Sequence, residues 1–124
     1  MNDLKELREI LPNYEIICIK NDLYIISTPY CKWTTPFSTI RKNIRLIKSI
    51  HDNLNNIVQF LELNDFTFDG YMFNRNSSPY IKAIVHVSSL SIHGITMNSI
   101  DDFYQVIREK LNLGLLSKPV IQNE

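Results

Sequence analysis

The residues best suited to chemistry in this 124-residue chain are cationic side chains that have no acidic neighbours in sequence. No aspartate or glutamate occurs between Leu23 and His51. That stretch holds five cationic residues: Lys32, Arg41, Lys42, Arg45 and Lys48. Residues three and four apart share one face of a helix, so Arg41, Arg45 and Lys48 are expected to lie side by side. The sequence therefore predicts a cationic helix face.

Two aromatic residues, Trp33 and Phe37, come just before this face. Cationic side chains beside aromatic rings suit contacts with a phosphate backbone or a stacked base. Arginine also anchors protein–protein interfaces. We predict one binding surface made of Lys32, Trp33, Arg41, Lys42, Arg45 and Lys48. The alternative is a solvated helix face whose acidic neighbours come from elsewhere in the fold.

The histidines and cysteines offer a second kind of chemistry. His86-Val87-Ser88 has the H-x-S form and resembles one motif of the two-histidine phosphoesterases. Those enzymes need a second such motif, which His93-Gly94-Ile95 does not supply. A histidine-dependent phosphoesterase or nuclease centred on His86 and His93 with Lys82 stays as an alternative. Cys31 would be a nucleophile if a histidine base lay within hydrogen-bond reach.

Other common site motifs are missing from the sequence. The chain has three glycines and therefore no glycine-rich phosphate loop, and no G-x-S-x-G, H-E-x-x-H or paired C-x-x-C motif occurs. The histidines do not have metal-site spacing either. We assign no catalytic residue, no metal and no cofactor from the sequence.

The elements that position these residues begin with a short amphipathic helix, capped by Asn2 or Asp3 and ended by Pro12. Residues 14–20 and 23–28 are rich in isoleucine and tyrosine, and Asn21-Asp22 between them favours a tight hairpin. Both runs are apolar at almost every position, which predicts cover on both faces and a place at the sheet centre. Residues 27–37 are expected to be irregular. A long helix is predicted over residues 36–62, with a weak segment at residues 53–56.

The second half of the chain predicts more strands and a last helix. Residues 66–73 and 80–88 form a second hairpin, and residues 91–96 a further short strand. The aromatic residues of the first of these strands are either buried or form a contact surface. Ser99 begins the last helix and Gly114 ends it. The fold class is α+β: an antiparallel sheet of four to five strands, with the long central helix and the C-terminal helix packed on one face. Residues 1–114 form one domain and residues 115–124 a tail.

Composition limits the function classes. Lysine plus arginine equals aspartate plus glutamate, 13 each, and a general polyanion binder would be clearly basic. A net charge of zero also permits self-association into a homodimer. The N-terminus has no apolar segment of a signal peptide and no run spans a membrane, so we expect a cytoplasmic chain with two free thiols, Cys18 and Cys31. Isoleucine (18) and asparagine (13) are abundant, which fits an A+T-rich genome.

Our first hypothesis is therefore a small non-enzymatic binding protein that occupies an acidic protein surface through the cationic face. Small size, the lack of a catalytic motif and a composition typical of an A+T-rich genome all fit an accessory or inhibitory protein of a phage or mobile element. The second hypothesis is a nucleic-acid or nucleotide-binding module that uses the same residues.

Overall fold

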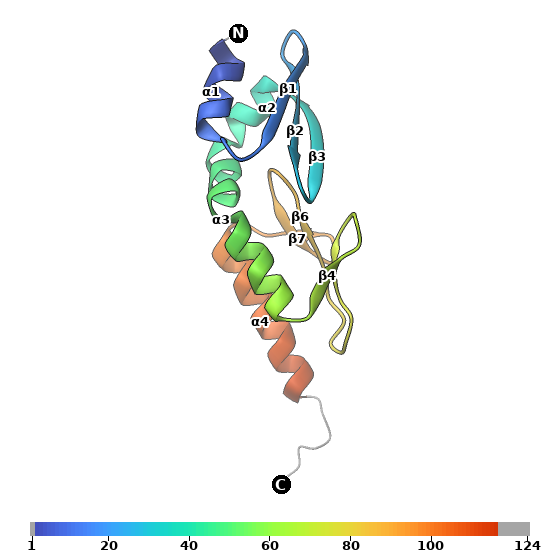
Figure 1. Cartoon of the computed structure of the whole chain (residues 1–124). Coiled ribbons are helices and arrows are strands. Elements are labelled where there is room, and N and C mark those ends of the chain that lie inside the picture. Colours follow the sequence, from blue (N-terminus) through green and yellow to red (C-terminus); the bar gives the residue numbers. More distant parts are fainter. Residues whose placement is uncertain (1, 117–124) are drawn as a thin grey trace.

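Two antiparallel sheets lie end to end along one side of the molecule, and helices line the other side (Figure 1). The computed structural model describes residues 2–116. The α+β class, the long helix, the C-terminal helix and the short N-terminal helix are as the sequence predicts. The strands are divided between a three-stranded and a five-stranded sheet, where the sequence predicted one sheet of four or five strands.

The first sheet has the order β1-β2-β3, with β1 at Glu15–Lys20, β2 at Leu23–Thr28 and β3 at Cys31–Pro36. The predicted hairpin is confirmed, and Asn21 takes a positive φ of 41° in its turn. The hairpin lies in a separate sheet in which β1 is an edge strand, so its predicted place at the sheet centre is wrong for β1. Residues 31–36 are a regular strand paired with β2 over its whole length, which corrects the prediction of an irregular segment. Pro36 is tolerated because β3 is also an edge strand, where a missing N–H costs no ladder bond.

Helix α1 (Asn2–Ile10) packs on this sheet, and the predicted long helix is two helices, α2 (Phe37–Lys42) and α3 (Ile44–Leu63). The break falls at Asn43, whose φ and ψ are −108° and 13°. Its side chain donates to the Thr39 carbonyl at 2.8 Å, a local bond that competes with regular helix. No break occurs at residues 53–56, because α3 is continuous there.

The second sheet has the order β4-β5-β6-β7-β8. Its strands are short: β4 (Phe66–Phe68), β5 (Phe73–Arg75), β6 (Lys82–Val85), β7 (Leu90–Ile92) and β8 (Ile95–Thr96). The turn at Asp69-Gly70 divides the predicted strand 66–73 in two. His93 and Gly94, both with positive φ, divide residues 91–96 in the same way.

Helix α4 (Ile100–Leu116) closes the described chain. The Ser99 hydroxyl accepts from the Asp102 N–H at 3.0 Å, which confirms Ser99 as its cap. The helix runs two residues past Gly114, so the predicted end there is wrong, and residues 117–124 of the predicted tail lie outside the described part.

Each sheet has its own hydrophobic core, and α3 contributes to both. The first core joins the first sheet to α1, α2 and the start of α3. The second core joins the second sheet to the rest of α3 and to α4. Two side chains cross between them: Tyr30, from the turn after β2, packs on Phe68 and Phe73 of the second core, and Val87, from the turn after β6, is buried in the first core. Leu54 contacts both cores.

Candidate functional site

Three cationic side chains, Arg41, Lys42 and Arg45, are exposed around the break between α2 and α3. We call them the cationic cluster. The backbone bonds from Asn43 N–H to the Thr39 carbonyl (3.2 Å) and from Ile47 N–H to the Asn43 carbonyl (3.0 Å) continue the helical ladder through the break. The three residues therefore stay within about one helical turn of each other. Within residues 2–116, none of the three forms an ion pair with a carboxylate.

An aromatic ring supports one member of the cluster. The guanidinium carbon of Arg41 lies 5.2 Å from the ring centroid of Phe37, a cation–π contact. Phe37 is itself held by Tyr24, whose ring centroid is 5.9 Å away. Phe37 therefore limits the freedom of the Arg41 side chain while leaving its charged end exposed.

Lys48, predicted as part of the same face, is occupied within the molecule. Its ammonium nitrogen donates to the Ile10 carbonyl at 2.9 Å and lies 3.1 Å from Asp52 Oδ1. The Ile10 carbonyl is at the C-terminal end of α1, where helix carbonyls have no partner in their own helix. Lys48 therefore fastens α1 to α3, and we leave it out of the cationic cluster.

Lys32 and Trp33 also lie away from the cluster. They are near the Cys31 end of β3, whereas α2 begins after Pro36 at the other end of the strand. Lys32 is exposed on the sheet's outer face. Trp33 points the opposite way, is half-buried in the first core, and meets the His86 ring edge-on at 5.2 Å. The predicted six-residue surface is thus divided among three places.

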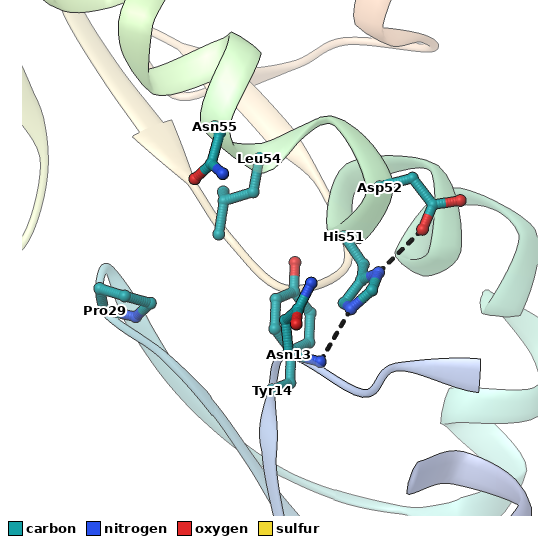
Figure 2. Close-up of a pocket in the computed structure, with 7 residues that line it drawn as sticks. All are labelled: Asn13, Tyr14, Pro29, His51, Asp52, Leu54 and Asn55. Atoms are coloured by element: carbon teal, nitrogen blue, oxygen red, sulfur yellow. Dashed lines mark hydrogen bonds and ion pairs between the residues drawn. The ribbon is translucent and has the colours of Figure 1, made fainter. Parts of the chain in front are cut away.

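A pocket of about 540 Å³ lies between the start of β1 and α3, with His51 in its wall (Figure 2). His51 Nε2 accepts from the Asn13 N–H at 3.1 Å, and its Nδ1 lies 2.8 Å from Asp52 Oδ1. Both ring nitrogens are therefore engaged, and His51 fastens the start of β1 to α3 rather than acting as a free base. The hydrogen bond from His51 is the main cause that lowers the pKa of the Asp52 carboxyl below its usual value, and the hydrogen bond from Lys48 is the second.

Tyr14 completes this pocket. Its ring packs edge-on against His51 at 4.7 Å, and its buried hydroxyl has no hydrogen-bond partner among the described residues. Burial is the main cause that raises the pKa of this phenol. The sequence did carry a signal for His51, because His51 is spaced four and three residues from Ile47 and Leu54 on the apolar stripe of α3.

Cys31 and His86 line a groove of about 390 Å³ between the two sheets. Burial raises the pKa of the Cys31 thiol and lowers the pKa of His86. His86 Nδ1 accepts the Ser88 N–H at 3.0 Å. A nucleophilic cysteine needs its thiolate form, and both shifts favour the neutral groups. Cys31 and a histidine therefore line the same groove, as the nucleophile hypothesis requires. Their surroundings do not favour the thiolate that a nucleophile needs.

The histidines of the phosphoesterase alternative are kept apart. His86 follows β6 and His93 follows β7, so the two lie at opposite ends of the β6–β7 hairpin. Lys82 is at the His93 end, where its carbonyl accepts the His93 N–H at 2.8 Å. No group of three metal-ligating side chains occurs in the described part of the chain.

Comparison with family models, curated proteins and solved structures finds no match to this chain. No helix within residues 2–116 has the length and apolar character to cross a bilayer.

Proposed function

We propose that this chain is a non-enzymatic binding protein that occupies an acidic surface of a protein partner through the cationic cluster. The observation that carries the proposal is the cluster itself: three adjacent, exposed cationic side chains with no carboxylate partner among residues 2–116. Two of them are arginines, whose planar donors match a carboxylate in two parallel hydrogen bonds.

The cation–π contact between Arg41 and Phe37 also supports the proposal that the cluster binds a partner. A side chain that is already ordered loses less conformational freedom when a partner binds. Arg41, held over the Phe37 ring, is therefore a good anchor, and the exposed Lys42 and Arg45 beside it would add long-range attraction.

We extend the proposal to a cytoplasmic accessory or inhibitory protein of a phage or mobile element. The small size and the abundance of isoleucine and asparagine support this origin. Two free cysteines support a reducing compartment.

The test is capture of partners from a lysate of the cells that produce the chain, with and without nuclease. The bait is wild type, or a triple variant with Arg41→Gln, Lys42→Gln and Arg45→Gln. A matched control triple, Lys82→Gln, Arg108→Gln and Lys110→Gln, removes the same charge from the other half of the molecule. We expect wild type and the control triple to capture the same protein, with or without nuclease. The cluster triple should not capture it.

Two outcomes would contradict the proposal. Equal capture by all three baits would mean that the cluster is a solvated surface. Capture of nucleic acid, lost from the cluster triple and weakened steeply by salt, would establish the nucleic-acid alternative instead.

A further inference from the structure

The first sheet has one covered face and one open face. Side chains alternate along its strands, and Ile16, Tyr24 and Ile26 are buried against the helices. On the other side of β1 two large apolar side chains stay in solvent, with Ile17 55% and Ile19 48% exposed. Figure 1 shows α1, α2 and α3 on one side of this sheet. On the other side the chain reaches only the Cys31 end of β3, where Lys32 shares a groove with Gly70 and Tyr71 of the β4–β5 turn. The sequence pattern predicts cover on both faces, and the described chain covers one.

The strand register arranges the open face in rows. Glu15 pairs with Ser27, which pairs with Lys32, so the first row has a negative charge on β1 and a positive charge on β3. The next row is Ile17, Ile25 and Thr34. Beyond a register shift in β1, the last row is Lys20, Leu23 and Pro36, so it has an exposed positive charge on β1. Neither Glu15 nor Lys32 has an ion-pair partner among residues 2–116.

This pattern is complementary to itself. If two copies stack their open faces about a twofold axis that runs along β2, β1 of each copy lies over β3 of the other. Glu15 then faces Lys32 of the second copy, and the same pair forms a second time by symmetry. Ile25 meets its own equivalent near the axis, and Ile17 lies over Thr34. Two pairs of opposite charges thus lie at one end of the interface, beside the apolar row of Ile17 and Ile25, in a self-complementary twofold arrangement.

We propose that a second copy of this chain docks on the open face of the first sheet and forms a homodimer held by two Glu15–Lys32 pairs. The zero net charge of the chain removes the general repulsion between copies. The face is about 20 Å by 14 Å, from the usual rise and spacing of strands, so the dimer belongs to the small, transient class of interfaces.

Sedimentation equilibrium over a concentration series up to about 1 mM, the upper range for weak complexes, tests the proposal. Glu15→Lys and Lys32→Glu each place like charges opposite one another, and each should weaken dimerisation by about tenfold or more. The double variant carries both reversals, restores the opposite pairs, and should return to within about threefold of wild type. Glu62→Lys and Lys82→Glu make the same net-charge changes on exposed sites elsewhere and should leave the dimer unchanged.

A second variant tests the apolar centre. Ile17→Thr keeps a β-branched side chain on the open face, so the strand is retained while dimerisation weakens. Three results would overturn the proposal: wild type that stays monomeric throughout the series, a dimer unaffected by Glu15→Lys, or loss of the dimer that the double variant fails to restore.

Discussion

Four cationic side chains in residues 41–48 have two different environments. Arg41, Lys42 and Arg45 end in solvent, whereas Lys48 reaches the Ile10 carbonyl and Asp52. At the scale of the residue, this difference decides which charges are available to a partner. Ile10 is 38 residues from Lys48 in sequence, so helical spacing alone could not separate Lys48 from the others. The helical proximity of Arg41 and Arg45, by contrast, could be predicted from their spacing, whereas the exposure of the cluster comes from the structure.

His86 carries a prediction about pH. Its half-burial against Trp33 lowers its pKa below the usual 6.5, so the unfolded chain binds the proton more readily than the folded chain. The stability that His86 contributes is therefore present above its unfolded pKa and is lost as the pH falls through its folded pKa. We expect the free energy of unfolding to fall more between about pH 7.5 and pH 5 in wild type than in His86→Gln.

Urea denaturation at both pH values checks this prediction. The other titratable groups are common to both proteins, so the difference between the two pH dependences isolates His86. The same pH dependence in both proteins would contradict this account of His86.

At the scale of the element, the boundaries were predictable where capping and turn residues set them. Pro12, Asn21-Asp22 and Ser99 mark a helix end, a turn and a helix start that the structure confirms. β3 was missed because Pro29, Pro36 and the aromatic residues between them suggest a loop, and its regularity comes from pairing with β2. The break at Asn43 was missed because one asparagine is a weak local signal that the packing of α2 on the sheet reinforces.

His51 links two of these elements and carries the second prediction. In His51→Leu the Asn13 N–H loses its acceptor, so its hydrogen exchange should become much faster. The free energy of unfolding should fall by about 1–3 kcal/mol, since a buried hydrogen-bonding group is removed.

Amide exchange followed by NMR and urea denaturation measure the two effects. Asp52→Asn is the control, because it changes the Nδ1 side of the ring and leaves the Asn13 bond to Nε2 in place. An Asn13 amide that stays protected in His51→Leu would show that His51 does not hold the start of β1.

At the scale of the whole molecule, the chain builds two cores on one long helix. The apolar stripe of α3 was visible in the sequence, but which strands share a sheet depends on pairings that local pattern does not encode. Tyr30 and Val87 each pack in the core of the other sheet and so connect the two cores.

Photo-crosslinking in the producing cells tests binding through the cationic cluster most directly. A benzophenone side chain replaces Ser38, which is exposed on α2 three residues before Arg41, so all three cationic residues are retained. We expect an adduct with one protein, lost when Arg41→Gln and Arg45→Gln are added, and absent when the probe replaces Lys82. No adduct from position 38, or the same adduct from position 82, would contradict binding through the cluster.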